Sequence, residues 1–501
     1  MAGGAGAADG APEVVVVGGG IAGLVAAREL ALAGLRPLVL EAWSAPGGAV
    51  GRHTVAGLEL DAGAESFATR GGIVAALLTE LGLGPAIATP SGLGAWVQLP
   101  SGAGTLPRTG LLGVPAHPWA RDVRATIGLV GSVRASADRW LPPARGTVRR
   151  DGSAASLGAL VATRMGRRVL DRLVTPVVRG VHAADPYDLD VDAVAPGLRA
   201  ALAAGGSLGG AVASLRALAP AGAAVAGLVG GMFGLVDALV RELEAHGGRV
   251  ETSARVRALR REGPTGPGGP SSGWSGWSLD VAGGDGTVRV VRARRVVLAL
   301  PGPAAAELLA PQVATLATSR PAAGADVVLA TLVLDAPALD AAPRGTGVLV
   351  APGVGAVTAR ALTHATAKWA WLAAAAGPGR HVLRLSFGPE AAAMEAGELT
   401  ALARHDASVL LGVPLAPAQV VGSGRVRWSG SLPLPSPAHR ALVAAARAGV
   451  ASLPGLEVCG AWLAGNGLAA VVADARAAGR RLSTAPDGAA GTRGIDPVNT
   501  R

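Results

Sequence analysis

One short segment near the start of the chain constrains the fold more than any other feature. Residues 13–42 read EVVVVGGGIAGLVAARELALAGLRPLVLEA, which is an apolar run, a glycine-rich turn, a helical pattern and a second apolar run. An uninterrupted apolar run such as Val14–Val17 is typical of a strand that is covered on both faces. The order strand, helix, strand predicts a βαβ unit and a doubly wound α/β fold with a parallel sheet.

The turn of this unit carries a phosphate-binding pattern. Gly18, Gly20 and Gly23 have the spacing G-x-G-x-x-G, which allows a tight turn, close approach of a pyrophosphate and close packing of helix on strand. The pyrophosphate would lie at the amides of the helix N-terminus. Glu41 follows the second strand about twenty residues on, where an acid accepts from ribose hydroxyls. The residues expected to contact an adenine dinucleotide here are Gly18, Gly20, Ile21, Ala22, Gly23, Glu41 and Ala42.

Composition limits the classes of protein and of partner. The 501 residues are enough for about two or three domains, and the net charge of +10 indicates an acidic partner. No nucleic-acid motif appears, so an anionic small molecule or an anionic membrane surface is the expected partner. The single Cys459 excludes internal disulfides and multi-cysteine metal sites, and no metal-ligand cluster or catalytic triad stands out. The start shows no signal peptide, and residues 217–236, the longest uncharged run, predict a buried strand and turn rather than a spanning helix.

Residues 41–67, EAWSAPGGAVGRHTVAGLELDAGAESF, bear on the identity of the dinucleotide. A glycine pair at Gly47 and Gly48 precedes Arg52 and a D-x-G segment at Asp61. This order resembles the flavin amine oxidase and protoporphyrinogen oxidase superfamily, and the resemblance implies FAD as the cofactor. Arg52 would neutralise a phosphate, and small residues would let the backbone meet a flat ring; a plain loop and hairpin is the alternative. The expected contacts are Gly48, Arg52, Gly63, Ala64, Glu65 and Ser66.

Later segments are expected to return to the nucleotide. Residues 244–263 predict a strand, a turn and a strand, and residues 293–309 predict a strand followed by a helix that begins at Pro301. Residues 455–482 predict a strand, a loop and a helix whose N-terminus suits the negative charge of a reduced flavin. Asn466 either caps that helix or contacts the flavin. The resemblance implies contacts from Val256, Trp428, Gly460, Asn466, Gly467 and Leu468.

The middle of the chain narrows the resemblance. Residues 169–194, VLDRLVTPVVRGVHAADPYDLDVDAV, resemble the segment of oxygen-dependent protoporphyrinogen and coproporphyrinogen III oxidases in which L-x-x-P-x-x-x-G-V precedes A-x-D-P. Further matches follow in the family's order at 106–115, 227–243, 345–350, 365–371, 382–388 and 425–428. Two departures concern the substrate pose. Phe233 stands where a polar residue is common, and Pro433-Leu434-Pro435 replaces the usual P-Q-Y before His439.

The resemblance implies an FAD-dependent oxidase of heme biosynthesis. Hydride would pass from a porphyrinogen to flavin N5, O2 would accept the electrons, and a six-electron oxidation would release three molecules of H2O2. The composition is similar to that of high-GC actinobacteria, in which this family generally acts on coproporphyrinogen III; protoporphyrinogen IX is the alternative. No side chain is expected to be catalytic, because the substrate needs an apolar slot and cations for its propionates.

Two basic residues are candidates for substrate contact. Arg108 lies near the family's carboxylate-binding arginine and is either a propionate ligand or a solvated loop residue. Lys368, the only lysine, lies in ATAKWAW and matches the family's K-W pair; it either contacts the substrate or flavin side or forms a structural pair within a strand. Three functions compete: a flavin amine oxidase, for which one Tyr and three Phe provide few rings, a carotenoid desaturase, and a carrier of porphyrin or heme.

The expected architecture has three parts. A GR2-type Rossmann FAD-binding domain takes residues 12–90, 225–310 and 440–484, an α+β substrate-binding domain takes 91–110 and 311–439, and a helical insert takes 111–224, with disordered tails at 1–11 and 485–501. Residues 119–150 combine seven arginines with Trp119 and Trp140, which is typical of a helix on an anionic leaflet or of a solvated face. The expected location is the cytoplasm, at the inner face of the cell membrane, with a ferrochelatase as a further partner.

Overall fold

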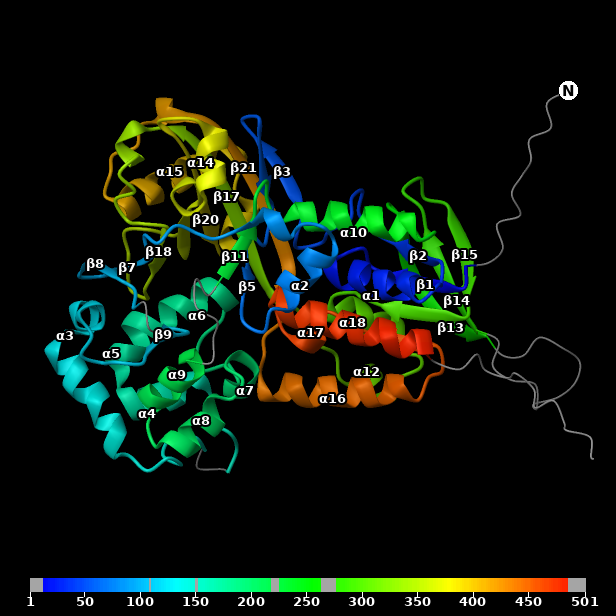
Figure 1. Ribbon diagram of the computed structural model, residues 1–501, viewed down its shortest axis with the longest axis horizontal. Coiled ribbons are helices and arrows are strands. Elements are labelled where there is room, and N and C mark those ends of the chain that lie inside the picture. The colour runs from blue at the N-terminus through cyan, green and yellow to red at the C-terminus, as the bar shows by residue number, and fades with distance from the viewer. Residues whose placement is uncertain (1–11, 108–109, 149–151, 218–224, 263–275, 485–501) are drawn as a thin grey trace, which may run out of the picture.

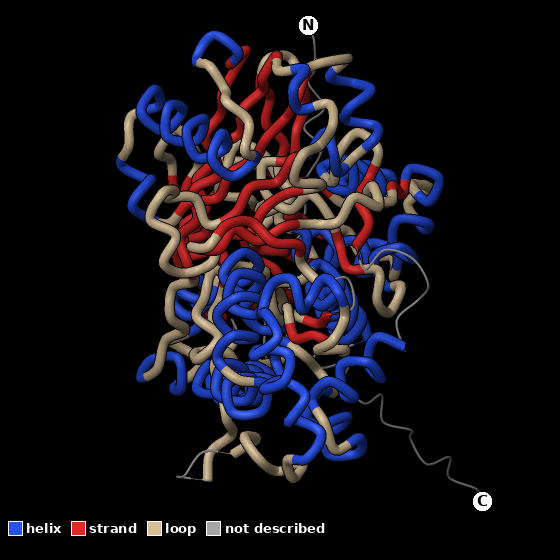
Figure 2. Tube along the Cα trace, turned by 90° about the vertical axis from the view of Figure 1, so that its left-hand side faces the viewer, coloured by secondary structure: helices blue, strands red, loops and turns tan. Residues whose placement is uncertain are grey.

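The computed structural model describes residues 12–107, 110–148, 152–217, 225–262 and 276–484. Arg108 and the two predicted tails lie outside the described residues. Three lobes are visible: a nucleotide lobe, a second lobe built around a large sheet, and a lobe made mostly of helices (Figure 1). Seen from the side, the large sheet lies above the helical lobe (Figure 2).

A five-stranded parallel sheet forms the centre of the nucleotide lobe. Its order is β12-β2-β1-β16-β22, and the strands come from distant parts of the chain. Every residue of β1, β2 and β16 is buried, as the apolar runs require of strands covered on both faces. The predicted doubly wound α/β fold is confirmed. The strands are β1 (Val14–Val17), β2 (Pro37–Leu40), β12 (Arg249–Glu251), β16 (Arg295–Leu298) and β22 (Leu456–Val458).

Helices and a small antiparallel sheet cover the two faces of this sheet. On one face α1 lies between α10 and α18 (Figure 1). The other face packs against α11, α16 and the sheet β13-β14-β15. These elements are α1 (Ile21–Leu32), α10 (Phe233–Ala245), α11 (Gly302–Leu309), α16 (Pro437–Ala451), α18 (Leu468–Thr484), β13 (Arg255–Glu262), β14 (Gly276–Ala282) and β15 (Val288–Ala293).

A seven-stranded sheet organises the second lobe. Its order is β21-β17-β20-β19-β18-β7-β8, antiparallel except between β18 and β7. Helix α15 covers one face with apolar contacts. The elements are β7 (Trp96–Leu99), β8 (Gly102–Thr105), β17 (Ala325–Asp335), β18 (Gly347–Val350), β19 (Ala361–His364), β20 (Arg380–Phe387), β21 (Val420–Leu432) and α15 (Ala396–Leu411).

Short strands join the nucleotide lobe to the rest of the molecule. The hairpin β3-β4 follows the glycine pair and reaches the large sheet, while β11 pairs with β5 and β6. The strand predicted within 217–236 is thus confirmed in its described part. The bounds are β3 (Arg52–Val55), β4 (Leu58–Asp61), β5 (Phe67–Ala68), β6 (Ile87–Ala88), β11 (Val225–Leu228) and α2 (Ile73–Glu80).

The third lobe is a bundle of short helices around a wholly buried arginine. The Arg164 guanidinium pairs with Asp138 and donates to the carbonyl oxygens of Pro142, Arg145 and Gly206 at 2.9, 3.1 and 2.9 Å. Because Pro142, Arg145 and Gly206 lie in segments that connect the helices, one side chain satisfies the carbonyl groups of those segments. The helices are α3 (Arg121–Ser136), α4 (Leu157–Met165), α5 (Arg167–Val169), α6 (Thr175–His182), α7 (Val191–Val194), α8 (Leu198–Gly205) and α9 (Leu208–Ala217).

A helix that spans a membrane needs about 20 mostly apolar residues. Within the described residues, no single helix is long and apolar enough to cross a membrane. Helices α8 and α9 reach that length only as a pair, which is bent by 117°.

Candidate active site

Glycines from two loops face each other at the carboxyl end of β1 and β2. The Gly47 amide donates to the Gly19 carbonyl at 2.8 Å, which fixes one loop against the other. A Cβ added to Gly20 would meet only the Cα of Gly48, at 3.9 Å. The chain's own packing therefore leaves open space at Gly20, which is what close approach of a pyrophosphate requires. The loops fit the phosphates of FAD.

The other two glycines of the motif have different tasks. Gly18 has a φ of +102°, a conformation that L side chains rarely adopt. A Cβ on Gly23 would lie 1.8 Å from the Gly18 carbonyl oxygen, so helix α1 could not lie this close to β1 with any other residue. The first residues of α1, Ile21 and Ala22, are buried.

Glu41 follows β2 directly and lies against the same glycine loop. Its carboxylate accepts from the amide of Gly19 at 2.7 Å and from the amide of Trp43 at 2.8 Å. Two backbone donors therefore hold a buried acid at the edge of the glycine loop. This is the position that the predicted ribose contact requires.

The D-x-G segment is fastened from the large sheet. The Trp428 indole in β21 donates to the Ala62 carbonyl at 2.9 Å, and the Arg384 guanidinium in β20 donates to the Gly63 carbonyl at 2.7 Å. A Cβ on Gly63 would lie 2.2 Å from the Ala49 carbonyl oxygen. The segment that was predicted to meet the flavin ring is therefore held by side chains of the large-sheet lobe. Trp428 contacts this segment through the backbone carbonyl of Ala62.

Glu65 is the centre of a buried ionic network. Lys368 Nζ lies 2.5 Å from Glu65 Oε1, and Arg384 Nη2 lies 3.0 Å from Glu65 Oε2, with all three side chains at most 16% exposed. Burial alone would raise the pKa of Glu65, but Arg384 and Lys368 outweigh it and lower the pKa to about 2. Glu65 is therefore a carboxylate at any physiological pH.

Lys368 is a structural partner of Glu65, as one of the two interpretations of the sequence proposed. The prediction that it lies within a strand is wrong: it ends α13 (Ala365–Lys368), a short helix that follows β19. The helix turns the chain back toward Glu65. Arg384 was not among the predicted site residues. Its motif, VLRLSFG at residues 382–388, contains nothing that distinguishes this arginine from the many others in the chain.

Asp61, at the end of β4, behaves in the opposite way. Burial raises the pKa of its carboxyl to about 7, although the Arg384 guanidinium acts against this shift. Its nearest backbone donor is the amide of Phe233, 3.2 Å from Oδ1. Two acids four residues apart thus differ strongly in protonation, because Glu65 has two cationic partners and Asp61 has only a share of one.

The face of the large sheet opposite α15 is mostly apolar. Strand pairing places Leu329, Ser386, Ala361 and Leu349 side by side in one row, all half-buried, and the next row holds Thr331, Arg384 and Thr363. Helix α6, which carries the predicted G-V motif, lies against this face: a Cβ on Gly180 would be 2.6 Å from the Leu349 side chain. The face is a candidate surface for a flat apolar substrate.

The C-terminal segment differs in detail from the prediction. A short helix, α17 (Ala461–Ala464), precedes the predicted one, which begins at Leu468. The side-chain nitrogen of Asn466 donates to the Pro433 carbonyl at 3.3 Å, whereas a helix cap would use the side-chain oxygen of Asn466 as an acceptor. Its buried Oδ1 has no partner among the described residues, and a Cβ on Gly467 would meet nothing within 4 Å. Open space before a long helix fits the negatively charged end of a flavin.

Arg52 and Val256, two residues that were predicted to contact FAD, have other neighbours within the protein. Arg52 pairs with Glu59 at 3.0 Å and with Asp237 at 2.6 Å, and its guanidinium lies 4.3 Å from the centre of the Phe233 ring. Its charge is thus already shared by two carboxylates of the chain. Val256 lies at the start of β13, beside a bulge. Contacts with FAD stay predictions for every residue named in the sequence, Ala42, Ala64, Ser66, Val256 and Gly460 included.

Comparisons with known proteins agree with this geometry. The chain is 31% identical to a protein from Mycobacterium leprae named coproporphyrinogen III oxidase, over 93% of this chain and 96% of that one. A protein of the same name from Mycobacterium tuberculosis is 32% identical, over 94% of this chain and 96% of that one.

Solved structures share the fold. A crystal structure from Exiguobacterium sp. 255-15, which carries the provisional name protoporphyrinogen oxidase, has a TM-score of 0.77 at 23% identity and covers 94% of this chain and 98% of that one. Cyclohexylamine oxidase from Brevibacterium oxydans has a TM-score of 0.62 at 17% identity, over 94% and 99%.

A family model described as flavin containing amine oxidoreductase matches residues 21–485, nearly the whole chain. The predicted flavin cofactor, FAD, is confirmed by this family match. The chain belongs to the flavin containing amine oxidoreductase family.

Proposed function

We propose that the chain is an FAD-dependent oxidase that converts coproporphyrinogen III to coproporphyrin III with O2 as the acceptor, in heme biosynthesis. The observation that carries this proposal is similarity over almost the full length of both proteins to mycobacterial proteins named coproporphyrinogen III oxidase. The apolar sheet face opposite α15 supports it, since a tetrapyrrole is flat and mostly apolar.

The bound FAD would supply the hydride acceptor and the path of electrons to O2. The chain's own residues place and enclose the substrate. Because Arg384 and Lys368 are both paired with Glu65, the described part of the apolar face offers the propionates no unpaired cation near this network. We infer that the propionates lie away from this network; Arg108, the contact proposed from the sequence, lies outside the described residues.

The first prediction tests the reaction. FAD-loaded protein under air should form a fluorescent porphyrin and H2O2 from coproporphyrinogen III, with a higher kcat/KM than for protoporphyrinogen IX. Steady-state fluorescence and a peroxide assay measure both. A yellow protein that oxidises a primary amine and neither porphyrinogen would refute the proposal.

The second prediction tests the glycine loops. Gly20→Ala should fold with an unchanged Tm, since its Cβ has room in the chain itself, but should bind FAD at least about tenfold more weakly because the Cβ enters the phosphate path. Gly23→Ala should lower the Tm of the apoprotein, because its Cβ would lie 1.8 Å from a carbonyl oxygen. Gly234→Ala, which meets nothing within 4 Å, is the control. Equal FAD affinity of Gly20→Ala and wild type, by fluorescence titration, would contradict the fit.

The third prediction concerns Lys368. The lowered pKa of Glu65 gives stability that is present above its unfolded value of 4.5 and is lost as the pH falls toward about 2; the linked free energy is at most about 3 kcal/mol. Lys368→Met should remove part of it, so that acid unfolding followed by circular dichroism occurs at higher pH.

Lys368→Arg is the matched control, because it retains the charge. It should keep the acid stability, the kcat and the KM of the wild type if Lys368 is a structural partner. A loss of turnover in Lys368→Arg without loss of stability would indicate contact with the substrate or the flavin instead.

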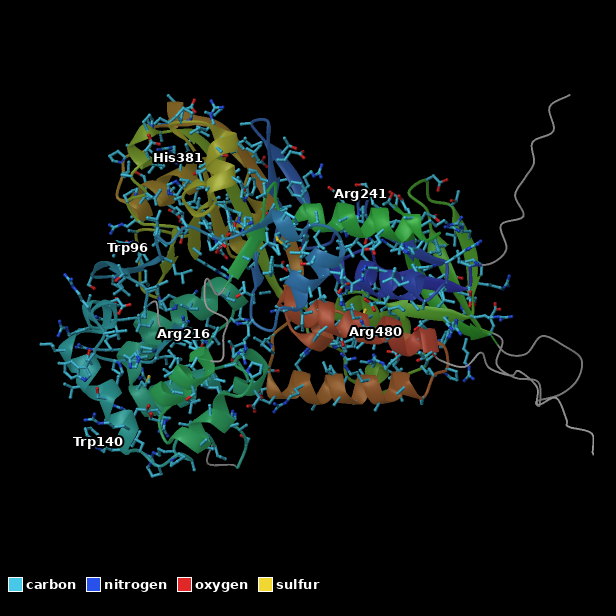
Figure 3. The ribbon with its side chains drawn as sticks, in the orientation of Figure 1. Trp96, Trp140, Arg216, Arg241, His381 and Arg480 are labelled. Atoms are coloured by element: carbon cyan, nitrogen blue, oxygen red, sulfur yellow. The ribbon has the colours of Figure 1, made fainter. Side chains whose placement is uncertain are left out.

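We also propose that the helical lobe lies on the cytoplasmic face of the cell membrane, where a ferrochelatase could receive the product. Helix α3 exposes Leu129, Val130 and Val133 among arginines, and Trp119 and Trp140 are more than half exposed. Trp140 lies at the outer edge of the helical lobe (Figure 3). Exposed apolar side chains among cations suit an anionic leaflet.

Flotation with vesicles tests this surface. The protein should float with phosphatidylglycerol vesicles at low salt and much less with phosphatidylcholine vesicles. Leu129→Ser combined with Val133→Ser should abolish flotation, whereas Val288→Ser with Val290→Ser, on exposed strand β15 of the nucleotide lobe, should not. Equal behaviour of the two double variants would exclude α3 as the contact.

A further inference from the structure

A small cavity lies beside the Glu65 network. It is bounded by the β3-β4 hairpin, by the large sheet and by α13 and α14 (Ala370–Ala376). Its volume is about 30 Å³, and Asp61, Glu65, Thr331, Trp371 and Arg384 are its polar or partly polar walls. A water molecule needs about 10–15 Å³ measured in this way, so the cavity has room for one.

Two polar atoms in this wall lack a partner. Thr331 Oγ1 and Trp371 Nε1 are buried, and neither forms a hydrogen bond within the part of the chain that the structure describes. The Thr331 side chain is only 2% exposed. An indole N–H only donates, whereas a hydroxyl both donates and accepts. A water molecule can accept from the indole and serve the hydroxyl in either direction, so one water satisfies both atoms.

Asp61 supplies the third polar wall. Its carboxyl can donate a hydrogen bond when protonated and accept one when ionised. The charged groups around Asp61 are Arg384 of β20 and Glu65 with its partner Lys368. Arg52 stands opposite Asp61 in the register of the β3-β4 hairpin, but its guanidinium forms ion pairs with Glu59 and Asp237. His53 in β3 is the remaining titratable neighbour, and burial together with Arg384 lowers its pKa.

We propose that this cavity binds one water molecule, held by Trp371, Thr331 and Asp61. Through this water, Asp61 takes up a proton and later returns it, on the side of the site where the flavin is expected. The role in turnover rests on the proposed function. Each round removes two electrons and two protons from the substrate, and O2 takes up both to become H2O2. A proton that does not travel with the electrons is held in the interval: the cavity water gives one proton to the Asp61 carboxylate as it receives the proton released on the substrate side, and the reverse transfer returns it.

The position and protonation of Asp61 suit this task. It stands two residues before Gly63, whose carbonyl is bonded to Arg384, in the segment predicted to lie against the flavin. Burial sets its pKa to about 7, so that both protonation states are populated near neutral pH. Glu65, four residues on, cannot serve, because its two cationic partners keep it ionised.

The water site is tested with FAD-loaded, full-length protein. A high-resolution crystal structure should show one ordered water in the wild type and in Thr331→Ser, which keeps the hydroxyl. Thr331→Val, which has the same shape without the hydroxyl, and Trp371→Phe should lose the water. A dry cavity in the wild type, or a water that persists in both variants, would overturn the site.

The proton store is tested by two readouts that need no porphyrinogen. Infrared spectra should show a protonated carboxyl that titrates near pH 7 in the wild type and is absent in Asp61→Asn. Photoreduced flavin mixed with air should be reoxidised with an inflexion near pH 7, which Asp61→Asn removes while slowing the rate roughly tenfold at neutral pH. Asp285→Asn, on an exposed turn, should behave like the wild type.

The outcomes separate this inference from the proposed function. A wild type without a carboxyl that titrates near pH 7, or an unchanged pH profile in Asp61→Asn, would overturn the proton store. If Asp61→Asn does not fold, the pair Thr331→Val and Thr331→Ser decides, because only the former should shift the inflexion. A protein that shows the inflexion but oxidises no porphyrinogen would refute the proposed substrate and leave the store intact.

Discussion

The buried carboxylate of Glu65 joins the two halves of the candidate site. It belongs to the loop after β4, yet both of its cations, Arg384 and Lys368, belong to the large-sheet lobe. Removing one partner from a buried ion pair destabilises the fold because it leaves an uncompensated charge, so the contact helps to fix the relative position of the lobes. The D-x-G segment predicted to lie against the flavin inherits that position, because Arg384 also binds the Gly63 carbonyl.

The same network explains how the apolar sheet face can contain the charged side chain of Arg384. Arg384 lies in the middle of the sheet face, where burial of an unpaired guanidinium would cost desolvation energy. Glu65 pairs with both Arg384 and Lys368, and the charge of Arg384 only partly offsets the burial of Asp61. The ion pairing of Arg384 and the raised pKa of Asp61 are therefore two results of one charge distribution. An acid and a carboxylate held a few residues apart are a common arrangement for moving protons.

Local patterns allowed the fold to be predicted, and long-range contacts limited the prediction of the site. The βαβ unit with its glycine turn was predicted correctly because consecutive residues form its strand, turn and helix. The partner of Lys368 lies 303 residues away, and no spacing rule connects the two. Asn466 has the residue type of a cap, but its side-chain oxygen forms no hydrogen bond among the described residues, and its nitrogen donates to Pro433. Arg384 and the cavity at Thr331 arise only when β17 and β20 meet the hairpin.

The one lysine of the chain is best understood beside Arg384. The guanidinium uses its several donors for Glu65 and for the carbonyls of Gly63 and Asp61, which only a planar fork can reach together. Lys368 makes one charged contact with Glu65 from the end of a short helix, with its ammonium 5.0 Å from the centre of the Trp369 ring. A single point charge is sufficient there. The pair with Glu65 therefore favours the structural interpretation of this lysine over contact with the substrate or the flavin.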